Sequence, residues 1–201
     1  MKEQGNVALV LVAVIALAAI GGFLILNYNG IVKLDKIVEE SQAQIEVVCQ
    51  RRLDLIPNLV ETVKGYAAHE KETFTAITQA RSRAQGVLDG IKGKDSLVKE
   101  DFMALAASQS QLTSTLKSLF ALVENYPVLQ ASTNFLALQD QLEGTENRIS
   151  VTRQRYNSSV RGYNTKITMF PGNIVAPMFG FEEKGYFEAK EEALEPVTIG
   201  F

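Results

Sequence analysis

The feature that most constrains this chain is an uninterrupted apolar run near its N-terminus. Val7 to Leu26 contains twenty residues without a charged or polar side chain, and thirteen of them are Val, Leu, Ile or Phe. As an α-helix, which rises about 1.5 Å per residue, the run would be about 30 Å long, matching the hydrocarbon core of a bilayer. The sequence therefore predicts a transmembrane helix over 7–26, in contact with membrane lipid and preceded by a short segment over 1–6.

A retained anchor is favoured over a cleaved signal peptide. The run continues for eight apolar residues beyond Ala16-Leu17-Ala18, which has the small-x-small pattern of a cleavage site. Lys2 precedes the run, whereas Lys33 and Lys36 follow it closely. The positive-inside rule then favours an external N-terminus and a cytoplasmic body, by a margin of one charge.

The rest of the chain has the pattern of an all-α protein. Apolar residues recur at three- and four-residue steps, which predicts helices over about 29–84, 96–125 and 132–168. A Gly- and Asp-containing loop at 85–95 and the Tyr126-Pro127 step separate them. Long helices with apolar stripes predict a long antiparallel three- to four-helix bundle over 27–170. Pro57 lies inside the first helix and predicts a kink near 53–57.

The last thirty residues differ from the bundle. The segment 171–201 is predicted to be irregular and apolar, because prolines, glycines and aromatic residues alternate from Phe170 to Phe181. One interpretation is that it packs along the bundle, and another is that it contacts a neighbouring subunit or the membrane surface. The candidate interaction strip consists of Phe170, Ile174, Met178, Phe179 and Phe181.

Several polar residues share the phase of the apolar stripes. At 100° per residue, four of them fall within an arc of about 40° on the third helix, and Arg52 has the phase of the stripe on the first. Buried charges are tolerated when they are paired, so we expect a polar network in which Arg52 or Arg153 meets a glutamate. The network is predicted to comprise Arg52, Glu146, Arg153, Asn157 and Asn164. Specifying helix register is the favoured role, and a ligand or catalytic site is the alternative.

Signals for chemistry are few. Cys49 and His69 are each the only residue of their type, so neither a disulfide nor a paired histidine metal site is indicated. No phosphate loop, nucleophile elbow or basic nucleic-acid patch is present in the sequence. We therefore predict no catalytic, cofactor-binding or metal-binding residues, no enzymatic activity and no nucleic-acid partner.

Several motifs resemble those of the LemA family. They are the 22-residue stretch from Cys49 to Glu70, Glu124-Asn125-Tyr126-Pro127, 142–149, 153–157, and Phe170-Pro171-Gly172-Asn173 with Gly180-Phe181. Their order and spacing match from about Tyr28 to Phe187. The positions that match the family pattern are Arg51, Arg52, Asp54, Pro57, Asn58, Glu146, Arg148, Arg153 and Asn157.

The resemblance implies a bacterial single-span protein of the cytoplasmic (inner) membrane, with a small external N-terminus, a mostly cytoplasmic helical bundle and no enzymatic activity. Some members of the family resemble magnetosome-associated proteins, and some are encoded near membrane proteases or other envelope proteins, so the resemblance also suggests membrane proteins such as proteases as partners. We expect a membrane-anchored scaffold that self-associates as a homo-oligomer or holds protein partners. The alternative is a membrane-tethered sensor or adaptor that binds a small ligand or peptide between its helices.

Overall fold

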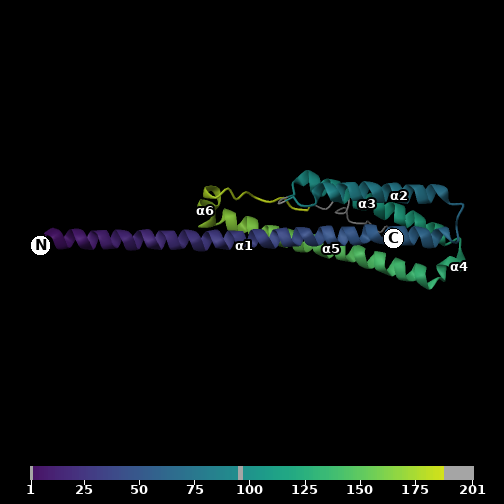
Figure 1. Ribbon diagram of the computed structural model, residues 1–201, viewed down its shortest axis with the longest axis horizontal. Helices are drawn as coiled ribbons and strands as arrows, with labels where there is room; N and C mark the ends of the chain where they lie inside the picture. Colours follow the sequence, from purple (N-terminus) through teal and green to yellow (C-terminus); the bar gives the residue numbers. More distant parts are fainter. Residues whose placement is uncertain (1, 95–96, 188–201) are drawn as a thin grey trace, which may run out of the picture. The chain divides into compact units, whose positions relative to one another are not determined.

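The computed structural model of the chain describes residues 2–94 and 97–187. Within these ranges the chain is all-α, which confirms the predicted fold class, and it contains no strand. The helices are α1 (Lys2–Lys64), α2 (Lys71–Ile91), α3 (Lys99–Val123), α4 (Pro127–Gln130), α5 (Thr133–Thr168) and α6 (Gly172–Met178), shown in Figure 1. The part of the predicted C-terminal segment from 188 to 201 lies outside the described residues.

The chain divides into two compact units. Among the described residues, unit 1 is formed by 2–38 together with Ser159–Lys184, and unit 2 by Glu39–Ser158 together with 185–187. Both α1 and α5 contribute to each unit.

In unit 1, the first part of α1 carries outward-facing apolar side chains. The large apolar residues from Leu11 to Leu26 are exposed except for the half-buried Leu24, and Leu26 reaches 75%. By length and composition, α1 contains a stretch that could cross a membrane. Beyond this stretch Ile31 and Val38 are buried. The end of α5 packs here, where Lys166 Nζ lies 3.3 Å from Asn27 Oδ1.

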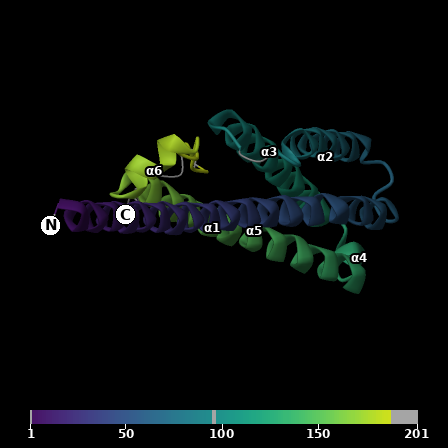
Figure 2. The ribbon, with the colours of Figure 1, turned by 60° about the vertical axis from the view of Figure 1, so that its left-hand side comes forward.

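In unit 2, the remainder of α1 joins α2, α3 and the first part of α5 in a helical bundle. Helices α2 and α3 pack against each other, as the two views in Figures 1 and 2 show. The ring centroids of Phe102 on α3 and Tyr156 on α5 are 5.0 Å apart. The aliphatic core includes Leu53, Leu59, Ile77, Leu105, Leu112 and Leu119, each of which is fully buried.

The first helix of the bundle ends earlier than its apolar pattern predicts. Instead of one helix over 29–84, α1 ends at Lys64 and α2 begins at Lys71, with a turn between them. The Gly65 N–H donates to Glu61 O, and Ala67 turns into the core with 1% exposure. The apolar period did not reveal this turn, because α2 again presents an apolar face to the core after it.

The predicted loop at 85–95 is also displaced. Gly86 and Gly90 lie within α2, which continues to Ile91. A glycine costs a helix about 1 kcal/mol relative to alanine, whereas burying a large aliphatic side chain contributes about 1.5 to 3 kcal/mol. Leu88 and Ile91 are each 2% exposed, so packing outweighs the two glycines. The turn follows at Lys92 and Gly93, where Gly93 has a φ of 78°.

The segment predicted to be irregular after 170 contains a short helix. Pro171 occupies the N-cap position of α6, and Gly180, with a φ of 73°, follows its end. Proline is tolerated at a helix start and glycine at a helix end, so these residues delimit a helix rather than prevent one. Val175 and Ala176 anchor it through burial.

Pro57 lies inside α1, which continues through it. Proline has no N–H, so the carbonyl of Leu53, four residues earlier, lacks its helical donor. Arg81 on α2 donates its Nε–H to Leu53 O at 2.9 Å. A side chain from a neighbouring helix thus satisfies the carbonyl that the proline leaves free.

Candidate functional site

Arg52 is the centre of the polar cluster in unit 2. Its phase on α1 turns it inward, and it is 3% exposed. Its Nη1 lies 2.8 Å from Glu146 Oε2 and donates to Gln109 Oε1 at 3.2 Å. Its Nη2 donates to Thr113 Oγ1 at 2.8 Å. One guanidinium therefore links α1 to α3 and α5, an arrangement suited to the planar, multi-donor arginine head.

The electrostatics of this cluster are those of a buried cation with a half-exposed partner. Burial lowers the pKa of Arg52, and the Glu146 carboxylate opposes that shift. The guanidinium stays charged, because its ordinary pKa lies far above neutral. The Glu146 side chain is 52% exposed, so it remains partly hydrated while it pairs. The pair therefore joins a buried charge on α1 to a partly hydrated charge on α5.

Two donors in the cluster have no hydrogen-bond partner among the described residues. They are Arg52 Nε and Gln109 Nε2, and each exposes less than 1 Å². A buried unsatisfied donor costs about 1 to 3 kcal/mol. Because both nitrogens are sealed from solvent, a molecule entering the adjoining cavity would reach them only after a side chain moves.

Arg153 contacts an aromatic ring in unit 2. Its guanidinium carbon lies 4.0 Å from the ring centroid of Phe187. Burial lowers its pKa, whereas Cys49 and the Glu146 carboxylate act in the opposite direction. Of the two arginines expected to meet a glutamate, Arg52 forms the ion pair with Glu146, and Arg153 stacks on Phe187.

The two asparagines bind main chain rather than Arg52. In unit 2, Asn157 donates to Phe187 O at 2.9 Å and accepts from Phe187 N–H at 2.8 Å. In unit 1, Asn164 makes the same pair of bonds with Lys184, both at 2.9 Å. Each amide matches the donor and acceptor of one extended residue. These hydrogen bonds attach the segment after α6 to α5. The helical phase of the two asparagines could not predict these main-chain partners.

A polar cavity adjoins Arg52. It has a volume of about 370 Å³ and is lined by α1, α3 and α5, including Cys49, Gln109, Glu146 and Arg153. Burial raises the pKa of the Cys49 thiol to about 12, although Arg52 acts in the opposite direction. The thiol is therefore neutral at physiological pH and unsuited to nucleophilic attack. No three His, Cys, Asp or Glu side chains among the described residues are grouped to hold a metal ion.

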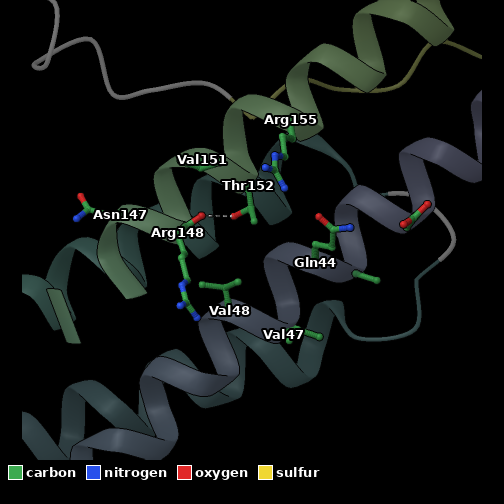
Figure 3. A pocket seen from close by; sticks show the side chains of 10 residues that line it. Gln44, Val47, Val48, Asn147, Arg148, Val151, Thr152 and Arg155 are labelled. Carbon is green, nitrogen blue, oxygen red and sulfur yellow. Dashed lines mark hydrogen bonds between the residues drawn. The ribbon is translucent and has the colours of Figure 1, made fainter. Parts of the chain in front are cut away.

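A second depression lies on the surface of unit 2, between α1 and α5. We call it the α1–α5 groove, and Figure 3 shows its lining. Its volume is about 630 Å³, and its residues are Glu40, Ala43, Gln44, Val47, Val48, Asn147, Arg148, Val151, Thr152 and Arg155. Val47 and Val151, one on each helix, are 68% and 44% exposed.

The groove combines apolar and polar side chains. Val47, Val48 and Val151 supply its apolar part, and Gln44, Arg148 and Arg155 supply a polar part that we call the rim. In Figure 3, Arg148 extends from α5 toward Val48 on α1. The Thr152 hydroxyl donates to the Arg148 carbonyl at 2.9 Å, so its polar atom turns back onto α5. The groove was not predicted from the sequence. The available signal was the i, i+4 spacing of Ala43 with Val47 and of Asn147 with Val151, outside the buried stripes.

The candidate interaction strip lies in unit 1. Phe170, Ile174, Met178 and Phe179 are exposed at 74%, 53%, 62% and 51%, whereas Phe181 is half-buried. Phe179 and Phe181 contact Tyr28 on α1, with ring centroids 4.8 and 5.7 Å away. The strip and the polar cluster therefore belong to different units.

With this geometry established, comparison with known proteins gives a family. A sequence profile of the LemA family matches residues 41–201. The chain belongs to the LemA family. The matched region includes the Arg52 cluster and every lining residue of the α1–α5 groove except Glu40.

Individual relatives of this family have modest sequence identity to the chain. Magnetosome protein MamQ 2 of Paramagnetospirillum magneticum is 28% identical over 94% of this chain and 75% of its own length. Magnetosome protein MamQ of Magnetospirillum gryphiswaldense is 27% identical over 96% of this chain and 77% of its own length. Protein LemA of Metamycoplasma hominis is 27% identical over 77% of this chain and 65% of its own length. All of these relatives come from bacteria, in agreement with the resemblance noted in the sequence.

Proposed function

We propose that this LemA-family chain is a non-catalytic scaffold, anchored in the bacterial cytoplasmic membrane, that self-associates or holds a protein partner through the α1–α5 groove. The observation that carries the proposal is the groove itself, in which exposed Val47 and Val151 lie between polar residues. Apolar anchors within a polar rim are the arrangement by which a groove accepts the apolar face of a helix.

The rim supports a protein partner over a small ligand. Arg148 and Arg155 supply two positive charges, and Glu40 supplies one negative charge. Exposed charges of both signs steer association and help to select among partners, although each contributes little to affinity. The groove is open at the surface of unit 2, which suits a contact with another helix.

The cytoplasmic placement of the bundle is part of the proposal. It depends on Lys33 and Lys36 after the apolar run against Lys2 before it. A margin of one charge favours this orientation under the positive-inside rule. A role at a membrane is supported by α1, which contains a stretch long and apolar enough to cross one.

The alternative is a sensor that binds a small ligand in the Arg52 cavity. It has less support, because Arg52 already engages Gln109, Thr113 and Glu146. The two unpartnered nitrogens are also sealed from solvent. These contacts suit a cluster that sets helix register.

Site-specific photo-crosslinking in intact membranes tests the scaffold proposal. We expect a photoreactive side chain at Val47 to give discrete crosslinked species, composed of two copies of the chain or of the chain with a partner. Val151→Asp should reduce their yield at least about tenfold, since a charge facing an apolar contact costs more than about 1.4 kcal/mol.

The matched control is a photoreactive side chain at Val128, which is 73% exposed but does not line the groove. It should give few or no discrete species. Equal crosslinking from positions 47 and 128, or yields that are unchanged by Val151→Asp, would contradict docking in the groove. A monomeric mass in mild detergent would contradict self-association. The scaffold proposal would then require a different protein as the partner.

A further inference from the structure

The apolar surface around α6 has no covering element among the described residues of unit 1. Its exposed side chains are Met169 at 61%, Phe170 at 74%, Ile174 at 53%, Met178 at 62% and Phe179 at 51%. Val175 and Ala176 lie on the opposite side of the helix and are buried. One face of α6 therefore packs on its own unit, while the other presents large apolar groups to the surroundings. A concentrated apolar surface of this kind marks a contact with another body or with lipid.

This surface lies beside the end of the apolar run. Tyr28 is two residues beyond Leu26, which is about 3 Å along an α-helix. The ring of Tyr28 lies 4.8 Å from that of Phe179 and 5.7 Å from that of Phe181. Both views of the ribbon show α6 next to α1, at the end of α5 (Figures 1 and 2).

The position along α1 matches the boundary layer of a bilayer. The headgroup layer on each side of the hydrocarbon core is about 5 to 8 Å thick. With 7–26 spanning the core, Tyr28 falls in that layer, where tyrosine is enriched. The rings of Phe179 and Phe181 lie within 5.7 Å of the Tyr28 ring, which brings the exposed face of α6 close to the level of the lipid headgroups.

The charges near α6 favour lipid over a second copy of the same surface. Beyond the apolar run, unit 1 has five basic and three acidic residues, a net charge of +2. They are the basic Lys33, Lys36, Arg161, Lys166 and Lys184 and the acidic Asp35, Glu182 and Glu183. Two copies facing each other here would bring like charges together, whereas anionic headgroups would neutralise them.

We propose that α6 is a second membrane contact, an in-plane helix whose Phe170, Ile174 and Met178 insert into the interface of an anionic bilayer beside the α1 anchor. An amphipathic segment of this kind buries its apolar face about 5 to 10 Å into the headgroup and acyl boundary. Two contacts, one across the bilayer and one along its surface, restrict how unit 1 can tilt and rotate at the membrane.

The test uses the absence of tryptophan from the chain. Full-length Phe170→Trp and Ile174→Trp variants are each reconstituted into phosphatidylcholine–phosphatidylglycerol vesicles, with and without lipid brominated near the top of the acyl chain. We expect blue-shifted emission and bromine quenching at least about twice that of a water-facing tryptophan, because the strip lies at the acyl boundary. Unfolding temperatures equal to that of the parent chain show that the variants are folded, and the two positions report independently.

Two matched variants set the scale. Val128→Trp, at a position 73% exposed on α4, represents water, and Ile15→Trp, at a position 64% exposed in the apolar run, represents lipid. Emission and quenching equal to those of Val128→Trp would overturn the proposal. A blue shift without bromine quenching would also overturn it, because protein would then cover the strip. If Ile15→Trp were not quenched, the apolar run of α1 would not lie in lipid. The argument from depth would then fail.

Discussion

The contact between Arg81 and the Leu53 carbonyl shows how one residue compensates for another on a different helix. Pro57 removes the donor that this carbonyl would have in an uninterrupted helix, and Arg81 Nε supplies a replacement at 2.9 Å. Because the donor is charged, this hydrogen bond is worth more than one between neutral groups. The proline and the arginine should therefore behave as an energetic pair.

We expect Arg81→Ala to lower the free energy of unfolding by about 1 to 2 kcal/mol, because it leaves the Leu53 carbonyl without its donor. In a Pro57→Ala background the loss should be smaller, since an alanine at this position restores the helical N–H. Urea unfolding of the full-length chain in detergent, followed by circular dichroism, measures all four members of the cycle. Arg83→Ala is the control, because Arg83 is exposed on the same helix. An equal cost of Arg81→Ala in both backgrounds would contradict the coupling.

Cys49 provides a second residue-scale prediction. Burial raises its thiol pKa from the ordinary 9.0 to about 12. The folded state therefore favours the neutral thiol. Its contribution to stability is complete below about pH 9 and is lost as the pH rises toward 12. We expect its reaction with a disulfide reagent at pH 8 to be at least about a hundredfold slower than in the urea-unfolded chain.

The control for thiol access is Cys49→Ala/Ser82→Cys, which moves the only cysteine to an exposed position on α2. Its thiol should react at nearly the same rate whether the chain is folded or unfolded. Fast modification of Cys49 in the folded chain would show that the cavity beside Arg52 admits reagents. That result would favour the ligand-binding alternative.

At the scale of elements, α6 depends on a close approach to α5. A Cβ placed on Gly172 would overlap the carbonyl oxygen of Lys166, whereas nothing lies within 4 Å of a Cβ placed on Gly162. Gly172 is buried, and Gly162 lies exposed within α5. Two glycines only ten positions apart in the same unit should therefore respond oppositely to the same substitution.

We expect Gly172→Ala to destabilise the fold by about 1 to 3 kcal/mol, because the added methyl group forces α6 away from α5. Gly162→Ala should be neutral or stabilising by up to about 1 kcal/mol, since alanine favours a helix over glycine. Thermal unfolding and limited proteolysis within 169–181 measure the two effects. Equal unfolding temperatures, or more rapid cleavage in Gly162→Ala, would contradict this account of the contact.

The same scale shows why helix boundaries were only partly predictable. The apolar period places α3 and α5 close to where the structure has them, because each lies between clear breaks. The turn between α1 and α2 was not predicted, because it contains no proline and a single glycine, Gly65. Gly86 and Gly90 suggested a loop, but burial of Leu88 and Ile91 keeps that stretch helical. Local signals compete with packing at these positions, and packing has the larger energy.

For the whole molecule, the testable property is its attachment to the membrane and its orientation there. We expect the chain to remain in the membrane after carbonate extraction, because Val7–Leu26 favours insertion by about 4 to 8 kcal/mol. In the Cys49→Ala/Ser82→Cys variant, we expect a membrane-impermeant maleimide to label intact cells only after permeabilisation.

A Cys49→Ala/Gln4→Cys variant supplies the opposite readout, since the predicted external segment 1–6 should be labelled without permeabilisation. Labelling of Ser82→Cys in intact cells would show that the orientation is the reverse of the predicted one, whose margin is a single lysine. Release of the chain by carbonate would instead remove the anchor. The scaffold proposal in its membrane-bound form would then fail.

The amino-acid sequence by itself determined the properties that depend on local composition and period. An apolar run of twenty residues defines a membrane-length helix, and recurrent apolar steps define the all-α body. The helical phase of Arg52 also predicted that its side chain faces inward and meets a glutamate. In the structure, Arg52 Nη1 lies 2.8 Å from Glu146 Oε2. These inferences need only the geometry of one helix.

The tertiary structure decided which faces meet and which remain open. Asn157 and Asn164 share a phase with Glu146, yet they bind the main chain of Phe187 and Lys184. Val47 and Val151 line one groove only because α1 and α5 lie side by side there. Helical period specifies the direction of a side chain around its own axis. What that side chain meets depends on packing between segments distant in sequence, which period does not encode.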